Sequence, residues 1–330
     1  MTPPREHGGG IDAAIAAHGG ARRDWLDLST GINPVPYPLP PLPASAWTDL
    51  PDRGAFARLD RAARMFWAVP DGAEIVVAGG ASALIAAIPG LWEVTGDQMP
   101  PPARVAIPGP TYNEHAAAFD AAGWRVDAGA TDDNGRGHDC AVIVNPNNPD
   151  GRRWTRDTLP PAPRRVIDES FCDETPDQSL IGLATQPDHI ILKSFGKFWG
   201  LAGLRLGFAI CPPQMAAKLR QRLGPWAASG PALAVAASAL EDPEWARATR
   251  MRLQTDAERL DQILTAAGMD IRGGTGLFRL AETAGAARIA RNLAASRILV
   301  RQFPYAPTWL RFGLPGDEPE FGRLTRALGS

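Results

Sequence analysis

The sequence predicts an α/β fold, with a mostly parallel sheet in a large domain and a smaller α+β domain after it. Short, mostly apolar runs alternate with helical patterns between residues 54 and 225. Such runs are typical of strands buried on both faces, and their alternation with helices favours parallel pairing. Small and polar residues gather directly after the runs, at the strand ends where open α/β sheets bind ligands.

The strands of the large domain are expected at residues 74–78, 104–107, 124–128, 141–145, 165–168, 189–192 and 206–210, with helices at 82–92 and 113–122. From residue 226 the pattern changes. A long helical region at 232–267 contains Pro243, which predicts a break there, and Gly268 follows as a helix stop. A strand at 277–280, a helix at 284–296 and apolar runs at 298–301 and 309–313 complete the smaller domain.

Six prolines stand among residues 34–43, which excludes a regular helix or an interior strand there. This segment is expected to cross in extended form between an N-terminal arm and the main domain, or to be a plain linker. The predicted division is an arm at 1–45, a large domain at 46–225 and a small C-terminal domain at 226–330.

Composition excludes several classes of protein. The formal net charge of the 330 residues is −2, so no global field favours nucleic acid or an anionic membrane. The three cysteines form no CxxC pair, so neither a disulfide framework nor a zinc site is expected, and no metal site is predicted. Neither a signal-type apolar run nor a stretch of 18 apolar residues is present. The expected location is the cytoplasm.

Lys197 lies in the most informative stretch, where an apolar strand leads into Ser194, a glycine-rich run and Arg205. Desolvation at the end of a buried strand lowers the pKa of an amine and makes it a nucleophile toward an aldehyde. A hydroxyl and a guanidinium beside it can hold a phosphate. Together they predict pyridoxal phosphate as cofactor. Taken alone, the run could equally be a solvated lysine in a turn.

Two other strand ends carry groups that this cofactor needs. Gly79-Gly80-Ala81-Ser82 lies between a strand and a helix, where backbone N–H groups can bind a phosphate, unless the turn only caps the helix. Asp168 ends a strand and could keep the pyridine nitrogen protonated, or it could be a helix N-cap.

Further candidates lie in loops and in the C-terminal domain. Asn148, in a turn-rich loop, could donate to the ring oxygen, and Tyr112 could stack on the ring or simply be packed or exposed. Arg301 and Arg311, on adjacent apolar runs, could bind a carboxylate or phosphate. His7 precedes three glycines in a segment expected to be flexible. The acids at 173, 174 and 177 are expected in a solvated loop.

These residues resemble the fold-type I pyridoxal-phosphate enzymes, the aspartate aminotransferase superfamily, over nearly the whole chain. The most specific pieces are Asn148-Pro149-x-Gly151, Asp168-Glu169-Ser170-Phe171 and Ser194-Phe195-Gly196-Lys197. The resemblance implies Lys197 as the Schiff-base lysine and Asp168 as the partner of the pyridine nitrogen.

The same resemblance implies roles for the other candidates. Asn148 would meet the ring oxygen, Tyr112 the ring face, and Arg311 the α-carboxylate of the substrate. The cofactor phosphate would be held by Ala81, Ser82, Ser194 and Arg205.

Within the superfamily, the chain is most similar to the threonine-phosphate decarboxylases of cobalamin biosynthesis and close to the histidinol-phosphate aminotransferases. The opening His7-Gly8-Gly9-Gly10, followed by the run 26–34, resembles the decarboxylase start. It implies decarboxylation of L-threonine O-3-phosphate to (R)-1-amino-2-propanol O-2-phosphate. The alternatives are a histidinol-phosphate-type aminotransferase and a non-catalytic binding protein of the same fold. The implied substrate contacts are His7, Gly31, Ile32, Asn33, Arg301 and Arg311.

Two positions depart from the family pattern. Phe171 stands where many members have a Tyr that donates to the ring oxygen, which leaves Asn148 as the main partner of that oxygen. Leu50 stands where a Tyr usually reaches the phosphate of the neighbouring subunit. The resemblance implies a homodimer, and the residue at 50 brings the usual cross-subunit contact into question.

Overall fold

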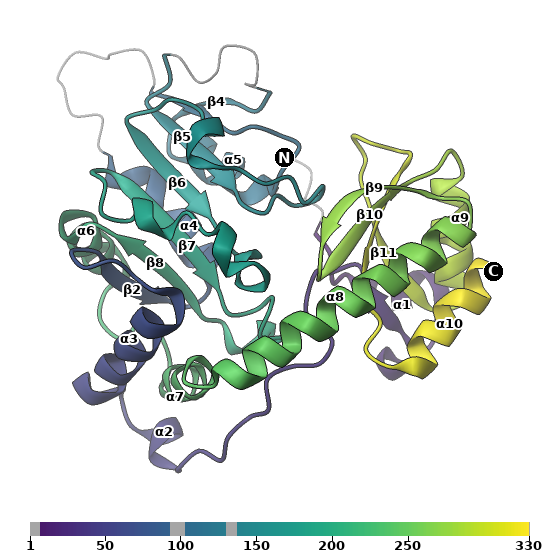
Figure 1. Cartoon of the computed structure of the whole chain (residues 1–330), viewed down its shortest axis with the longest axis horizontal. Coiled ribbons are helices and arrows are strands. Elements are labelled where there is room, and N and C mark those ends of the chain that lie inside the picture. The colour runs from purple at the N-terminus through teal and green to yellow at the C-terminus, as the bar shows by residue number, and fades with distance from the viewer. Residues whose placement is uncertain (1–6, 93–102, 130–136, 330) are drawn as a thin grey trace. The chain divides into compact units, whose positions relative to one another are not determined.

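The computed structural model of the chain describes residues 7–92, 103–129 and 137–329 (Figure 1). Contacts divide the chain into two compact units. The large unit consists of Tyr37–Asn148 and Arg152–Ala246, and the small unit of Met1–Pro36, Pro149–Gly151 and Arg247–Ser330. The proline-rich segment 34–43 contains no helix or strand, as its composition predicts.

The large unit is built on one sheet whose strands all match predicted ones. The strand order is β2-β8-β7-β6-β5-β3-β4. β8 is antiparallel to both of its neighbours, β2 and β7, and every other pairing is parallel. The prediction of a mostly parallel α/β sheet is therefore confirmed. The bounds are β2 Glu74–Ala78, β3 Arg104–Ala106, β4 Arg125–Asp127, β5 Cys140–Val144, β6 Arg164–Asp168, β7 His189–Ser194 and β8 Gly207–Cys211.

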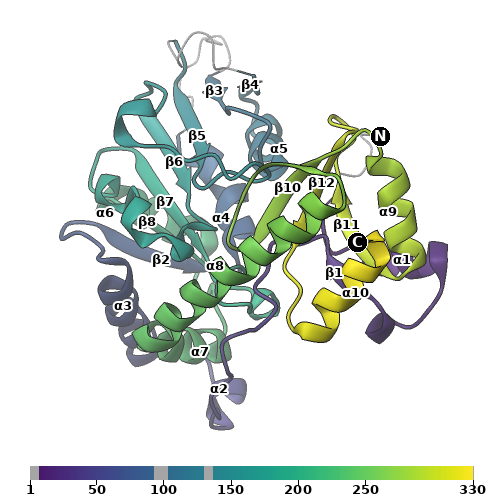
Figure 2. The same cartoon turned by 45° about the vertical axis from the view of Figure 1, so that its right-hand side comes forward.

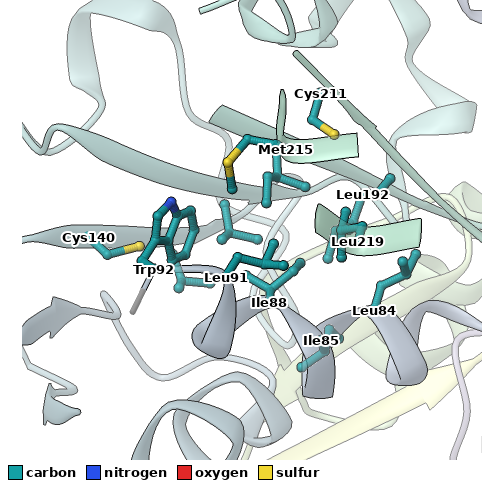
Figure 3. Packing of buried hydrophobic residues seen from close by; sticks show 14 of the residues in the cluster. Leu84, Ile85, Ile88, Leu91, Trp92, Cys140, Leu192, Cys211, Met215 and Leu219 are labelled. Carbon is teal, nitrogen blue, oxygen red and sulfur yellow. The ribbon is translucent and has the colours of Figure 1, made fainter. Parts of the chain in front are cut away.

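The central strands are apolar because other elements cover them. Every residue of β5 and β8 is buried. Helices α4 Ala81–Ala87 and α6 Pro213–Leu223 contribute apolar side chains to one core cluster with the strands. Figure 3 shows Leu84 of α4, Leu219 of α6 and Leu192 of β7 in this layer. The packing fixes the strand ends that carry the candidate site.

The other helices of the large unit include two that the sequence did not predict, α2 Ser45–Thr48 and α3 Arg53–Trp67. Helix α3 begins after Asp52, whose carboxylate accepts a hydrogen bond from Ala55 N at 2.7 Å, and it ends at Ala68 in the left-handed conformation. The cap satisfies one of the unpaired N–H groups at the helix start. The remaining bounds are α5 Asn113–Ala121 and α7 Gly230–Leu240, and 3-10 turns lie at Ile88–Leu91, Arg156–Thr158, Cys172–Glu174, Pro176–Gln178, Ile181–Leu183 and Ala202–Leu204.

The small unit contains a second sheet, in the order β1-β11-β12-β10-β9. β1 is parallel to β11, and the other pairs are antiparallel. Helix α9 packs on β11 and contacts both α1 and α10 (Figure 2). The bounds are β1 Leu26–Leu28, β9 Asp270–Thr275, β10 Phe278–Glu282, β11 Ile298–Gln302, β12 Trp309–Gly313, α1 Ile11–His18, the 3-10 turn Arg22–Asp24, α9 Ala286–Ala295 and α10 Glu318–Leu328.

The long helical region breaks where the sequence predicts. α7 ends at Leu240, and α8 Pro243–Ala266 begins with the proline itself, where a missing N–H costs no helical hydrogen bond. Gly268 follows with φ 76°, which suits a helix stop. No helix in the described ranges is both long and apolar enough to cross a membrane.

Strand β9 was missed because its sequence is glycine-rich. A Cβ on Gly273 would lie 2.1 Å from Asp150 O, and one on Gly274 would lie 2.2 Å from Phe278 O. Two backbones therefore approach closely at this strand, and only glycine fits. A strand that needs glycine for this reason lacks the β-branched signal by which strands are recognised.

Candidate active site

The predicted cofactor residues come together at one edge of the large sheet. β6 ends at Asp168 and β7 ends at Ser194, and these strands are parallel neighbours. Gly207, the first residue of β8, pairs with Ser194 on one side and with Ala78, the end of β2, on the other. The loops after β2, β6 and β7 and the loop before β8 therefore meet at this edge.

The turn after β2 is shaped for close approach. Gly80 is the N-cap of α4 with φ 97°, and a Cβ there would lie 2.6 Å from Arg205 Nη2. A Cβ on Gly207 would lie 2.3 Å from Ala81 N. The Arg205 guanidinium thus lies over the first turn of α4, and it donates to Ala202 O at 3.1 Å. A guanidinium beside free helical N–H groups is a donor set suited to a phosphate.

Tyr112 joins this corner to Asp168. Its hydroxyl hydrogen-bonds with Ser82, and it lies within electrostatic reach of Asp168 and Arg205. Burial, with help from nearby carboxylates, raises the pKa of Tyr112 above its usual value, so the phenol stays neutral. The structure therefore brings Tyr112, Ser82, Arg205 and Asp168 together, as the predicted roles require.

Asp168 is buried and held by a histidine that the sequence analysis missed. His115 Nε2 lies 2.8 Å from Asp168 Oδ2, and Ser170 donates to Oδ1 from N at 2.9 Å and from Oγ at 2.5 Å. Burial alone would raise the pKa of Asp168, but the hydrogen bonds from His115 and Ser170 outweigh it and hold the pKa below its usual value. The carboxylate is thus kept ionised, which suits a partner for a protonated ring nitrogen.

Lys197 is half-buried, between Phe195 and Phe198, which are both fully buried. Its Nζ lies 5.5 Å from the centre of the Phe171 ring, where the family pattern more often has a Tyr. Its carbonyl accepts a hydrogen bond from Gly200 N at 3.1 Å. The buried phenylalanines fix the loop and leave the lysine partly accessible.

The other two lysines of the chain have different environments. Lys193 is buried, with Nζ 2.7 Å from Glu169 Oε2. Lys218 is exposed on α6 and donates to Leu91 O at 3.3 Å. Lys197 is therefore the lysine best placed to react at the strand edge.

The asparagines of the loop after β5 divide between structural and candidate functional roles. Asn147 accepts from Thr111 Oγ1 at 2.6 Å and donates to Pro110 O at 3.0 Å. Asn145 accepts from Trp154 N at 2.9 Å. Asn148 is half-buried at the end of this group. Loop packing thus involves the Asn145 and Asn147 amides, and Asn148 stays the predicted candidate for the ring oxygen.

In the small unit, Arg301 and Arg311 are directly opposite each other on β11 and β12. Arg311 is 6% exposed and donates from Nη2 to Ser29 O at 2.8 Å. Burial, and the charge of Arg301, lower the pKa of Arg311 to about 10. Like charges directly opposite in a sheet are unfavourable. An anion between them would relieve that cost, so the pair suits an anionic ligand.

The N-terminal candidates lie beside Ser29, the residue that follows β1. Gly9 N donates to Ser29 Oγ at 2.7 Å, and a Cβ on Gly8 would lie 2.3 Å from Ser29 O. Gly8 and Gly9 therefore pack against Ser29, while His7 itself is exposed.

Gly31 and Ile32 precede Asn33, whose side chain joins two segments of the small unit through hydrogen bonds. Asn33 is buried, and its Oδ1 accepts hydrogen bonds from Arg252 Nη2 at 2.6 Å and Val35 N at 3.1 Å. Gly31 is buried and Ile32 half-buried.

The expectation of a solvated acidic loop is wrong for Asp173. It is buried, and its two oxygens accept from Trp67 Nε1 at 2.9 Å and Trp199 Nε1 at 3.0 Å. The partners are distant in sequence, so no local signal marked them. His115 could have been found, since it lies one helical turn after Tyr112 on α5.

The chain is similar in sequence to a known family and to several known enzymes. Residues 51–328 match the family described as aminotransferase class I and II. The threonine-phosphate decarboxylase of Sinorhizobium sp. is 42% identical over 99% of this chain and 98% of its own length. That of Pseudomonas aeruginosa is 38% identical over 98% and 97%. A histidinol-phosphate aminotransferase of Symbiobacterium thermophilum is 30% identical over 44% of this chain and 46% of its own length.

Solved structures share the fold at low identity. The histidinol-phosphate aminotransferase from Sinorhizobium meliloti, in complex with pyridoxal-5'-phosphate, aligns with a TM-score of 0.78 and 20% identity over 99% of this chain and 96% of its own. The L-threonine-O-3-phosphate decarboxylase from Porphyromonas gingivalis aligns with a TM-score of 0.72 and 18% identity over 92% and 98%. The predicted fold class, fold type I, is confirmed.

Proposed function

This chain belongs to the aminotransferase class I and II family, and from that premise we propose that it is a pyridoxal-phosphate-dependent L-threonine O-3-phosphate decarboxylase. The supporting observation is the near full-length similarity to two threonine-phosphate decarboxylases. Histidinol-phosphate aminotransferases match only parts of the chain.

The residues at the strand edge fit this cofactor. Lys197 would bond its aldehyde carbon, and Asp168, kept ionised by His115, would hold a proton on the ring nitrogen. The phosphate would bind at the first turn of α4. Gly80 leaves no room for a side chain there, and Arg205 supplies a guanidinium. The remaining contacts would come from Ala81, Ser82, Tyr112, Asn148 and Ser194.

When bound, the cofactor accepts the electron pair that departs from the Cα of the substrate. The protein decides which bond at Cα breaks, because only a bond perpendicular to the ring is activated. Arg311 would hold the carboxylate, and Arg301 would grip the substrate phosphate and so set that angle. His7, Gly31, Ile32 and Asn33 are further proposed contacts. Loss of CO2 and return of a proton to Cα by Lys197 would give (R)-1-amino-2-propanol O-2-phosphate.

The test offers threonine phosphate to the cofactor-loaded protein with no keto acid present. Release of one CO2 per amine phosphate formed supports the proposal. Turnover of histidinol phosphate only with 2-oxoglutarate would instead establish an aminotransferase. Lys218→Ala, an exposed lysine on α6, is the matched control for Lys197→Ala.

We further propose that the enzyme works as a homodimer in the cytoplasm. Several large apolar side chains of the large unit are well exposed, and a homodimer would bury part of this apolar surface. A mass near twice 35.2 kDa in solution is expected. The exposed side chains are Leu39, Trp47, Leu50, Met65 and Trp226.

A further inference from the structure

Three charged side chains lie buried under the loop that carries Lys197, and the proposed reaction uses none of them. Lys193 Nζ is 2.7 Å from Glu169 Oε2 and 3.8 Å from Asp173 Oδ1. None of the three is more than 4% exposed. We call Glu169, Asp173 and Lys193 the buried charge cluster. Charges are rarely buried unless they are paired and hydrogen-bonded, so a buried group of three needs an explanation.

Further hydrogen bonds hold the cluster in place. Glu169 accepts from Ser179 Oγ at 2.6 Å and from Leu180 N at 2.5 Å, in addition to Lys193. Burial alone would lower the pKa of Lys193, but the two carboxylates outweigh it and raise the pKa above its usual value. With one ammonium and two carboxylates, the net charge is +1 − 2 = −1.

The cluster is tied to both segments that surround Lys197. Glu169 follows Asp168, and Lys193 precedes Ser194. Asp173 binds the indole of Trp199, two residues after Lys197, and Trp199 stacks on Phe195 with ring centres 5.0 Å apart. The ring of Phe171, between Glu169 and Asp173 in sequence, contacts the Lys197 amine. A shift of the cluster would therefore move the lysine loop.

We propose that the buried charge cluster positions the Lys197 loop and, through its net negative charge, raises the proton affinity of the nitrogen of Lys197. Glu169, Asp173 and Lys193 are thus positioning residues. The proposal rests on the proposed covalent role of Lys197.

Other titratable groups lie at this edge of the sheet. They are Asp168, His115 and Tyr112, from β6 and α5, and Arg205, from the loop before β8. None of these groups is altered in the variants below, so their contribution is common to all the proteins compared.

The test measures the pH midpoint of the visible absorption of the cofactor bound to Lys197, in a set of variants that change the cluster charge. Asp173→Asn and Glu169→Gln each make the net charge 0. We expect the midpoint to fall in both. A unit charge about 10 Å away, at an effective dielectric constant of about 20, moves a pKa by about one unit.

The double variant Lys193→Met with Glu169→Gln restores the net charge of −1, and its midpoint is expected to return toward that of the unaltered protein. A purely structural role would lower the melting temperature in all three variants without this pattern of midpoints. Asp177→Asn and Lys218→Met, at exposed positions, are the matched controls and should leave the midpoint unchanged.

Trp199→Phe keeps the ring stack but removes the indole N–H that binds Asp173. It is expected to bind pyridoxal phosphate more slowly than the unaltered apo-protein, with a small change in melting temperature. Equal midpoints across the charge series, or an unchanged binding rate in Trp199→Phe, would overturn the proposal. If the unaltered protein itself shows no lysine-bound absorption, the proposed function fails first.

Discussion

The two units hold their charges in opposite ways. At the strand edge of the large unit, buried charged groups have bonded partners: His115 hydrogen-bonds to Asp168, and Lys193 pairs with Glu169. In the small unit, Arg301 and Arg311 are opposite each other on neighbouring strands, so like charges meet. Buried charged groups with bonded partners favour a single arrangement of the side chains. Two arginines that face each other are instead stabilised when an anion binds between them. The difference suits a cofactor that stays bound and an anionic substrate that comes and goes.

The largest effect is expected when the reactive amine of Lys197 is removed from the strand edge of the large unit. Lys197→Ala should lose the absorption of the lysine-bound cofactor and reduce turnover of threonine phosphate to the background level, because no other lysine can replace it. Absorption spectra and CO2 release measure both. A variant that keeps both properties would show that Lys197 does not bond the cofactor.

The next largest effect should come from the opposed arginines. Arg311→Lys keeps the charge but loses the bidentate fork, so kcat/KM should fall by about 10- to 100-fold, the equivalent of about 1.5–3 kcal/mol. Steady-state kinetics with threonine phosphate measure this. An unchanged kcat/KM would mean that Arg311 does not hold the substrate.

Arg301→Gln separates the two consequences of opposed charge. It should raise KM for threonine phosphate by about tenfold, as the loss of about 1.4 kcal/mol implies. Because a like charge is removed, the free energy of unfolding of the free protein should stay level or rise by up to about 1 kcal/mol. Arg291→Gln, exposed on α9, is the control. A clear loss of stability would show that Arg301 is not under repulsion.

The pairing of Asp168 should make stability depend on pH. The folded pKa of Asp168 lies below its usual value, so the pairing stabilises the fold above that usual value and is lost as pH falls through the folded pKa. His115→Phe should therefore cost about 1–3 kcal/mol at pH 7 and less in acid. Urea unfolding at several pH values measures the difference. A cost that does not vary with pH would contradict the pairing.

The smallest effect is expected at a surface pair. Arg58 and Glu241 form an ion pair with both side chains nearly half exposed. Exposed pairs are worth at most about 1 kcal/mol. Arg58→Ala with Glu241→Ala should therefore change the free energy of unfolding little, and raised salt should shrink the change further. A cost similar to that of His115→Phe would remove the distinction between buried and surface pairing.

The sequence predicted the candidate site residues that lie at or directly after the end of a strand. Asp168, Ser194 and Lys197 follow apolar runs, and both the runs and the sheet are as predicted. It was uninformative where function depends on partners far apart in sequence. Asp173 is joined to Trp67 and Trp199, and a short acidic stretch gives no sign of such burial. Local pattern predicts which strand a residue ends, but not which side chains fold over it.

The most direct test locates the covalent bond. The cofactor-loaded protein is reduced with borohydride, digested, and examined by mass spectrometry. Since the chain has three lysines, only three positions can carry the reduced cofactor on a side-chain amine. The account predicts the label on Lys197. A label on Lys193 or Lys218, or on no lysine at all, would contradict it.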